Sequence, residues 1–446
     1  MRSQDMRVRR SLLQSIALRL LVACALGAAA AAHAQLKIEI TSGVTDPIPI
    51  AIVAFARPSP TDDSADVADI VQHDLEGSGR FRAMARAQMR APTPTRAADV
   101  AVADWRALGN DYVVVGRVSI FAAGQLAVDF DLLNALNGQQ LASQRFTGAP
   151  NALRDAAHKV SDVIYEKILG VRGAFATRIA YVSVDSQPPA QRYQLVIADA
   201  DGENARVVLE SHQPIMSPAW SPDGEWLSYV SFENKKSCVY VQQVRTGERR
   251  QVSARAGING APAWSPDGRK LALTLGGSNG NPDIFVLDLS SQQLTRVTDD
   301  PAIDTEAVWA PDGNSLYFTS DRAGGPQIYR IGFTPGEHPK RITFGGTYNA
   351  RPRISPDGTQ LAMVTLEGSD YRIAVQDLAS GTVRVLSHGH LDESPSFAPN
   401  GAMLIFSGTE HGQSVLQRVS LDGLTAQRLK SEQADVREPV WAPFSH

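Results

Sequence analysis

One short phrase recurs along the second half of the chain and constrains its fold more than any other feature. It consists of a large apolar residue, Ser or Ala, Pro, Asp or Asn, and Gly. Five complete copies occupy residues 220–224, 264–268, 309–313, 354–358 and 397–401, and a broken sixth copy occupies 441–444. Successive prolines, at 222, 266, 311, 356, 399 and 443, are 44, 45, 45, 43 and 44 residues apart. A period of about 40–45 residues, with strand-like sequence between the copies, is typical of β-propeller blades.

Each copy of the phrase contains the residues that a tight turn needs. Proline fixes φ near −65° at the second position of the turn, Asp or Asn can bond its own backbone, and Gly allows a positive φ. The Trp, Ile or Phe before the turn can fill the space between neighbouring blades, where large apolar side chains contribute most. Six phased copies therefore predict a propeller rather than unrelated hairpins.

The two ends of the repeat region complement each other. Residues 179–184, 193–198 and 206–209 read as three strands without a leading strand that carries the phrase. Residues 439–444 read as a leading strand without its three followers. Pairing the C-terminal strand with the N-terminal ones completes a blade and hides the strand edges. We therefore predict an all-β six-bladed β-propeller over residues 174–446, closed by its N- and C-terminal strands.

Residues 35–173 contain no copy of the phrase and read as a small α/β domain. Alternating strand and helix patterns favour this class. The predicted strands are 48–55, 112–120, 126–133 and 139–146, the last two joined across Asn137-Gly138. The predicted helices are 66–75, 100–108 and 151–169.

The first 34 residues have the pattern of a secretory signal peptide. Five arginines and one acid are accompanied by an apolar run, residues 20–32, and a small-residue site, Ala32-His33-Ala34. Cleavage between Ala34 and Gln35 follows from this order. A membrane anchor would need about 20 uninterrupted apolar residues. Two variants stay open: twin-arginine export, since Arg9-Arg10 is present, and lipidation of Cys24.

Removal of that segment changes the composition in two ways. Lys and Arg fall from 43 to 38 and Asp and Glu from 47 to 46, so the formal net charge goes from −4 to −8. From this negative net charge we predict that the mature chain has no nucleic-acid partner and does not insert directly into a membrane. Only Cys238 remains, so an internal disulfide is impossible. The fold depends on its apolar cores.

Three local patterns imitate functional sites. Residues 276–280 match Gly-x-Ser-x-Gly, but strands are predicted on both sides, whereas a nucleophile elbow needs a helix after it. Residues 199–202 faintly resemble a calcium loop, but the glycine is misplaced, which favours a hairpin turn. His388, His390, Asp392 and Glu393 could bind a metal, although their spacing fits no standard zinc pattern. We predict no catalytic residues, no metal and no cofactor.

The whole mature chain resembles the TolB family of the Tol–Pal system of Gram-negative envelopes. Matching segments are residues 42–44, 213–220, 259–262, 319–322 and 391–395, together with the domain order and the blade number. The resemblance implies a non-enzymatic periplasmic protein, expected to be a monomer. It also implies a role in outer-membrane integrity and in constriction at cell division. An alternative is a propeller-containing periplasmic hydrolase or peptidase, since fold alone does not settle function.

The resemblance also implies two partner sites. The lipoprotein Pal is expected at one mouth of the propeller, on the loops entering each leading strand, where loops on a rigid scaffold converge. The predicted mouth residues are Met216, Ser217, Asn259, Gly260, Ala261, Thr305, Glu306, Arg351, Asp392, Glu393, Arg437 and Glu438. We expect their charges to alternate around the rim and the backbone N–H groups of Asn259 and Gly260 to be free. The tail that contacts TolA is predicted to comprise Gln35, Leu36, Lys37, Ile38, Glu39 and Ile40.

Overall fold

A computed structural model describes most of the chain, and the described residues belong to one compact unit. They are residues 46–58, 66–89, 91–121, 124–186, 191–276, 281–431 and 435–444. The predicted signal peptide, its cleavage site and the tail from Gln35 to Ile40 lie outside the described residues.

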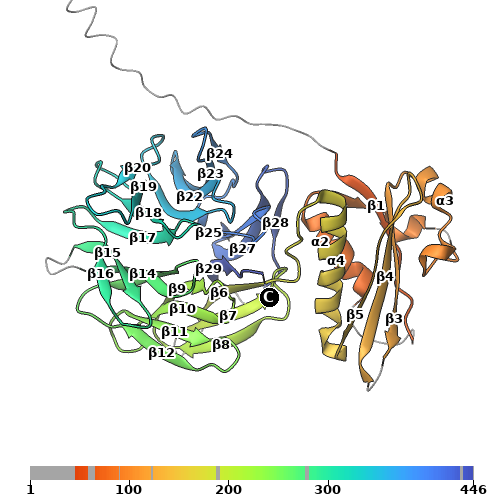
Figure 1. Ribbon diagram of the computed structural model, residues 1–446, viewed down its shortest axis with the longest axis horizontal. Helices are drawn as coiled ribbons and strands as arrows, with labels where there is room; N and C mark the ends of the chain where they lie inside the picture. The colour runs from red at the N-terminus through yellow and green to blue at the C-terminus, as the bar shows by residue number, and fades with distance from the viewer. Residues whose placement is uncertain are drawn as a thin grey trace, which may run out of the picture. The chain divides into compact units, whose positions relative to one another are not determined.

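The N-terminal part of the described chain contains a five-stranded sheet in the order β2-β1-β3-β4-β5 (Figure 1). The central strand β3 pairs in parallel with β1 and antiparallel with β4, so the sheet is mixed. The strands are β1 (Ile48–Ile52), β2 (Phe81–Ala83), β3 (Tyr112–Ile120), β4 (Leu126–Asn134) and β5 (Gln140–Gly148). The helices are α2 (Val67–Gly77), α3 (Val102–Ala107) and α4 (Leu153–Leu169), with short 3-10 turns at Arg86–Gln88, Ala97–Asp99 and Pro150–Ala152.

Alternate residues of the strands serve two cores, one on each face of the sheet. Ile50 and Ile52 of β1 pack with α2 and α4, whereas Ala51 packs with Trp105 of α3 on the other face. This follows from the two-residue period of side chains along a strand. Helix α2 begins after Asp66, whose carboxylate accepts a hydrogen bond from the Ala68 amide at 2.9 Å, a normal N-cap. The α/β reading is confirmed, although the three-residue strand β2 is too short to have been predicted.

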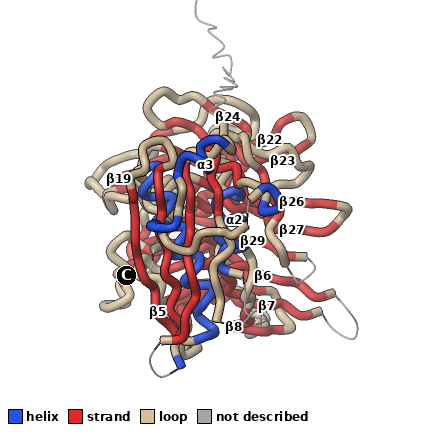
Figure 2. Tube along the Cα trace, turned by 90° about the vertical axis from the view of Figure 1, so that its right-hand side faces the viewer, coloured by secondary structure: helices blue, strands red, loops and turns tan. Residues whose placement is uncertain are grey.

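After Leu169 the described residues contain strands and loops without helix (Figure 2). The described part of the chain forms six four-stranded antiparallel sheets, here written from the leading strand outward. The first three are β29 (Val436–Trp441), β6 (Arg178–Asp185), β7 (Arg192–Asp199) and β8 (Arg206–Ser211); β9 (Ile215–Trp220), β10 (Trp226–Ser231), β11 (Cys238–Gln243) and β12 (Arg249–Ser253); β13 (Asn259–Trp264), β14 (Lys270–Gly276), β15 (Pro282–Asp288) and β16 (Leu294–Arg296). The others are β17 (Asp304–Trp309), β18 (Ser315–Ser320), β19 (Gln327–Gly332) and β20 (Lys340–Arg341); β21 (Asn349–Ile354), β22 (Gln360–Glu367), β23 (Asp370–Asp377) and β24 (Val383–Val385); β25 (Glu393–Phe397), β26 (Met403–Glu410), β27 (Gln413–Ser420) and β28 (Ala426–Arg428).

The C-terminal strand closes the ring as predicted. Strand β29 pairs antiparallel with β6, so that Trp441 stands opposite Ile179 and Arg437 opposite Val182. One blade therefore combines the last strand of the chain with three strands from the start of the propeller. As a result, every leading strand of the described propeller is paired with a neighbouring strand.

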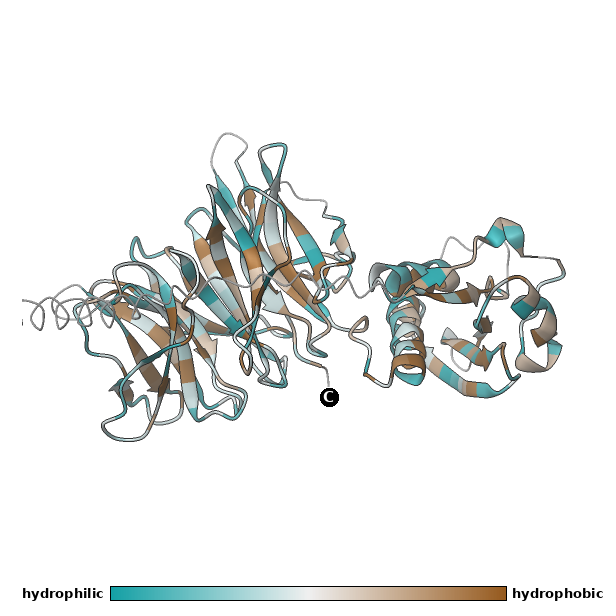
Figure 3. Cartoon of the chain, turned by 90° about the horizontal axis from the view of Figure 1, so that it is seen from above, coloured by the Kyte–Doolittle hydropathy of each residue, from teal (hydrophilic) through white to brown (hydrophobic). Residues whose placement is uncertain are grey.

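The repeated phrase does more than turn the chain. Gly224, the last residue of its first copy, has φ of +69°, as the turn chemistry predicts. The tryptophans also tie neighbouring blades together through their indole N–H groups. The Trp264 indole donates to the Ala219 carbonyl at 3.2 Å, and the Trp309 indole donates to the Ala263 carbonyl at 3.0 Å. Apolar colour follows the blade strands in Figure 3, where successive sheets pack face to face.

Candidate functional site at the propeller mouth

Every leading strand carries a register irregularity at the same place, and the residue there has a left-handed backbone. The six residues and their φ angles are Ser217 (52°), Ala261 (45°), Glu306 (56°), Arg351 (55°), Ser394 (56°) and Glu438 (50°). We call them the bulge ring. None is glycine, so each costs roughly 1–2 kcal/mol in backbone strain. Bulges re-aim side chains next to functional sites, and six equivalent ones mark this end of the propeller.

All six members of the bulge ring line one cavity of about 820 Å³ along the propeller axis. Arg353 and Ile354 of β21 line it as well, together with the proline turns of the repeated phrase. The Arg353 guanidinium donates to the Pro352 carbonyl at 2.8 Å, and burial lowers the pKa of Arg353. The cavity is thus polar near the bulge ring and bounded by apolar turn residues.

Charged members of the bulge ring hold their neighbours. The Arg351 guanidinium lies 3.2 Å from the Glu306 carboxylate, which also accepts the Arg351 backbone N–H at 3.2 Å. Arg351 reaches onward and donates to the Ser394 hydroxyl at 2.5 Å. The Glu438 carboxylate accepts the Ser217 backbone N–H. Because these links run from blade to blade, the ring is organised before any partner arrives.

Burial and neighbouring charge act in opposite directions on these groups. Burial raises the pKa of Glu438, although the Ser217 N–H and the Arg351 charge favour its ionised form. Burial alone would lower the pKa of Arg351, but the carboxylates of Glu306, Glu393 and Glu438 outweigh it and raise that pKa. The ring is therefore a set of interdependent charges, and altering one member changes the protonation balance of the others.

Exposed apolar side chains lie in or a few residues before five of the six leading strands; we call them the apolar rim, and two of them, Met216 and Ile258, line the axial cavity. The members of the apolar rim are Met216 (41% exposed), Ile258 (45%), Ile303 (47%), Phe344 (70%) and Leu391 (42%). Apolar groups around a desolvated polar centre are typical of protein-binding surfaces. The predicted set contained only Met216 of these five. A signal existed, because Ile258, Ile303 and Leu391 each stand eight residues before a repeat proline, at 266, 311 and 399.

Two predicted mouth residues have buried side chains, although Asn259 also lines the axial cavity. Asn259 is 1% exposed; its backbone N–H donates to the Ser237 hydroxyl at 3.0 Å, and its side chain donates to the Arg255 carbonyl at 2.8 Å. The expectation of a free N–H at Asn259 is therefore wrong. Asp392 is fully buried and its carboxylate accepts the Gly389 N–H at 2.9 Å. Both side chains therefore form hydrogen bonds with loop backbone.

The remaining predicted mouth residues lie at or beside the bulge ring. Gly260 and Thr305 line the axial cavity, where the Thr305 hydroxyl is 3.3 Å from that of Thr274. Glu393 stands 3.7 Å from the Arg351 guanidinium. Arg437 points elsewhere, with its side chain 56% exposed and paired to Asp435 at 2.7 Å. Charges of both signs meet at this end, and several of them pair with each other within the chain.

The patterns that imitate catalytic or metal sites do not assemble. Of residues 276–280, Gly276 ends β14 and 277–280 lie outside the described residues; the next described element, β15, is a strand that pairs antiparallel with β14, whereas a nucleophile elbow needs a helix there. His390 contacts Asp370, while Asp392 is directed to backbone, so the four predicted ligand candidates do not converge. Within the described ranges, no helix combines the length and apolar character needed to cross a bilayer.

Comparison with known proteins agrees with this architecture. Residues 165–445 match the model of the TolB beta propeller domain, and residues 36–141 match that of the TolB amino-terminal domain. The Tol-Pal system protein TolB of Xanthomonas oryzae pv. oryzae (strain PXO99A) is 46% identical over 412 residues, covering 92% of this chain and 93% of the relative. The protein of the same name from Xylella fastidiosa (strain M12) is 44% identical over 418 residues, with 92% and 93% covered.

A solved structure resembles the fold throughout. The crystal structure of TolB from Acinetobacter baumannii has a TM-score of 0.82 and 42% identity, and covers 90% of this chain and 97% of that one. Both the α/β part and the closed six-bladed propeller are included in a match of this extent. The chain belongs to the TolB family of Tol-Pal system proteins.

Proposed function

We propose that this protein is a non-enzymatic periplasmic scaffold of the Tol–Pal system that binds the lipoprotein Pal at the propeller mouth and contacts TolA through residues 35–40. Its role would be in outer-membrane integrity and in constriction at cell division. The observation that carries the proposal is the bulge ring: six residues with strained backbones line one cavity, five of them are linked from blade to blade, and exposed apolar side chains lie in or before five of the leading strands.

Two physical arguments favour a protein partner at this mouth. The apolar rim would lose water on binding, at about 25 cal/mol for each Å² of apolar surface buried. The bulge ring is already ordered by bonds between blades, such as the one from Arg351 to Glu306, so little side-chain entropy remains to be lost. Small members of the ring, Ser217 and Ala261, leave room for a partner's backbone to approach. Strain held in a rigid scaffold is typical of binding sites.

The non-enzymatic part of the proposal rests on how the cavity carboxylates are engaged. Glu306 is bound to Arg351 and to the Thr319 hydroxyl at 3.2 Å, and Glu438 caps a backbone N–H. General acid–base catalysis needs a carboxyl group within reach of a reacting proton. Both groups serve the scaffold instead.

The tail proposal rests on sequence. Leu36, Ile38 and Ile40 alternate with Lys37 and Glu39, a pattern suited to adding a strand to a sheet edge. In sequence the tail precedes β1, the strand next to the edge strand β2 of the five-stranded sheet. The tail lies outside the described residues.

Titration calorimetry of the mature chain with soluble Pal tests the mouth. Ala261→Tyr should block approach of the partner, and Ile303→Glu should put a charge into the apolar rim; we expect each to weaken binding at least tenfold, or about 1.4 kcal/mol. Folding should survive, since Ala261 already carries a Cβ at its positive φ and Ile303 is 47% exposed.

The matched control is Gln293→Tyr, an exposed position in the outer hairpin turn of the same blade as Ala261. It adds the same side chain away from the cavity and should leave the affinity unchanged. Wild-type affinity in both mouth variants, with intact folding, would move the partner site elsewhere on the propeller.

A further inference from the structure

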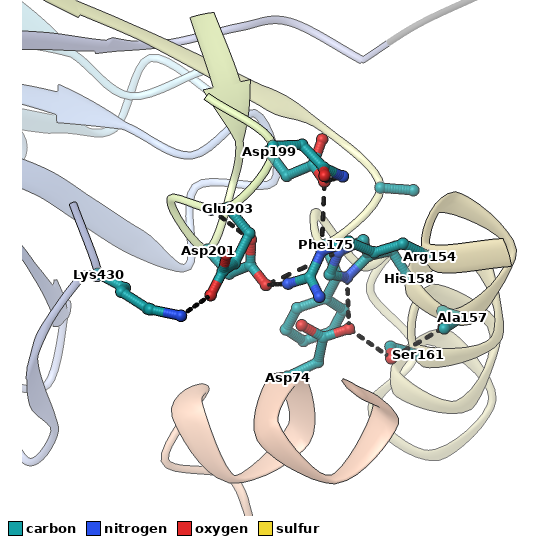
Figure 4. A network of polar contacts seen from close by, with 12 residues as sticks. Asp74, Arg154, Ala157, His158, Ser161, Phe175, Asp199, Asp201, Glu203 and Lys430 are labelled. Atoms are coloured by element: carbon teal, nitrogen blue, oxygen red, sulfur yellow. Dashed lines mark hydrogen bonds and ion pairs between the residues drawn. The ribbon is translucent and has the colours of Figure 1, made fainter. Parts of the chain in front are cut away.

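A buried polar cluster joins the α/β part of the chain to the propeller (Figure 4). Asp74 comes from α2, His158 from α4 and Asp201 from the turn between β7 and β8. Their exposed fractions are 1%, 2% and 5%. The sequence correctly predicts a hairpin turn at residues 199–202, where Gly202 has φ of +91°, but it does not show that this turn meets two helices.

The imidazole of His158 lies between two carboxylates. Its Nδ1 is 2.8 Å from Asp74 Oδ2, which also accepts the Ser161 hydroxyl at 2.7 Å. Its Nε2 faces Asp201 Oδ2 at 3.8 Å and has no hydrogen-bond partner, although it is buried. A neutral imidazole has one N–H and can donate to only one of these groups. With that proton on Nδ1, the lone pair of Nε2 would face a carboxylate; a protonated imidazole donates toward both.

The surrounding charges favour the protonated form. The groups around His158 are Asp74 on α2, Arg154 and Asp162 on α4, Asp199 and Asp201 at the β7–β8 turn, and Arg418 on β27. Arg154 contacts both Asp201 and, at 3.4 Å, Asp199. Asp162 is bound to the Phe175 and Ala176 backbone N–H groups and is not counted here. The other three carboxylates face the two guanidinium groups, so one further positive charge, that of a protonated imidazole, balances the cluster. Buried charge is costly unless it is paired.

A bound metal ion explains this geometry less well than a proton does. Asp74, His158 and Asp201 offer ligand atoms within 4.8 Å of one another. However, Arg154 donates to the Asp201 oxygen that faces the imidazole, and buried Arg418 adds a second cation nearby. Two guanidinium groups oppose a divalent ion at such short range.

We propose that protonated His158 bridges Asp74 of α2 and Asp201 of the first blade, so that the α/β domain docks on the propeller more firmly at low pH than at high pH. This device is separate from the mouth and does not depend on the proposed partners. Histidine suits it because its charge changes between pH 5 and 8.

The direction of the pH dependence follows from the balance of forces on His158. Burial lowers the pKa of His158, but the charge of Asp74, the hydrogen bond that the imidazole donates to Asp74 and the charge of Asp201 outweigh burial and the opposing Arg154, so the pKa is raised. The stabilisation is therefore complete below about pH 6.5, the unperturbed value, and is lost as the pH rises through the raised value. If the pKa of His158 is one unit higher in the docked state than in the undocked state, the docking equilibrium changes about tenfold with protonation.

Two measurements on the full mature chain test the proposal. The pKa of His158 is read from its imidazole resonances by NMR, with exposed His73 on the same helix α2 as the internal reference. Docking is read from distances between spin labels at two exposed positions, Asn137 in the α/β part and Thr246 in a blade turn, from pH 6.5 to 9. This range keeps Asp162, whose pKa is about 6, mostly ionised.

We expect a pKa for His158 above 6.5 and a label distance distribution that broadens as the pH rises. His158→Gln should abolish the pH response, whereas His73→Gln should retain it. A pKa at or below 6.5, a wild-type distance that does not change with pH, or an unaltered response in His158→Gln would each overturn the proposal. The wild-type measurements decide the matter even if His158→Gln fails to fold.

Discussion

Replacing Trp441 tests ring closure at its last strand. Trp441 is the final residue of β29, is 7% exposed and packs with Ile179 and other residues of the first and last blades. Its indole N–H donates to the Thr177 hydroxyl at 2.8 Å, and its backbone N–H donates to the Ser396 hydroxyl at 3.0 Å. Trp441→Ala removes the indole but keeps the hydrogen bond from the backbone N–H to the Ser396 hydroxyl. The loss of folding stability therefore reports mainly how well the closing strand packs.

The expected loss has two parts. Truncating a buried Trp to Ala costs about 3–5 kcal/mol, because apolar contacts are lost and a cavity remains. The indole hydrogen bond contributes about 1 kcal/mol within that total. Trp441→Phe separates the two, since it retains most of the apolar volume and loses the N–H; about 1–2 kcal/mol is expected. With native stabilities of about 5–15 kcal/mol, Trp441→Ala removes a large share.

Urea denaturation followed by far-UV circular dichroism measures these losses without depending on the fluorescence of the altered residue. Trp441→Ala should lower the midpoint strongly, and Trp441→Phe should lie between it and the wild type. A loss under about 1 kcal/mol for Trp441→Ala would mean that β29 contributes little to the ring, and the assignment of closure to this strand's packing would be refuted.

Three further predictions concern processing, the tail and pH. N-terminal sequencing of the exported protein should begin at Gln35, and a lipidated Cys24 would contradict this. Amide exchange of residues 35–46 should change when Pal occupies the mouth, whereas equal exchange with and without Pal would argue against coupling. Burial raises the pKa of Asp162 to about 6, despite hydrogen bonds from the Phe175 and Ala176 amides. Folding stability should therefore fall by up to about 3 kcal/mol as the pH rises from about 4 to about 6, and Asp162→Asn should flatten that slope in urea titrations.

Much of the architecture could be predicted from short stretches of the sequence. The phased Pro-Asp-Gly turns predicted the number of blades, because each turn depends on the backbone preferences of three adjacent residues. The incomplete blades at the two ends of the repeat predicted closure for a similarly simple reason: a strand without a partner must find one. The helix beginning after Asp66 and the strands around Asn137-Gly138 were also predictable from caps, turns and periodicity.

The backbone conformation at the propeller mouth could be found only from the tertiary structure. Ser217, Glu306 and Arg351 adopt left-handed backbones that their own side chains do not favour, so ring packing rather than local preference imposes the bulges. The exposure of Ile303 and the burial of Asp392 likewise follow from contacts in space, although both residues directly precede a leading strand.

The contact between His158 and Asp201 is the plainest case of this limit. His158 belongs to no motif, and the turn that carries Asp201 has the sequence of a hairpin turn, with only a faint resemblance to a calcium loop. Asp74 and His158 stand 84 residues apart, yet share a hydrogen bond inside the protein. Turns depend on residues that are adjacent in the chain, so they can be predicted from the sequence. Burial and charge pairing depend on residues that are adjacent in space, and only the folded structure determines which residues those are.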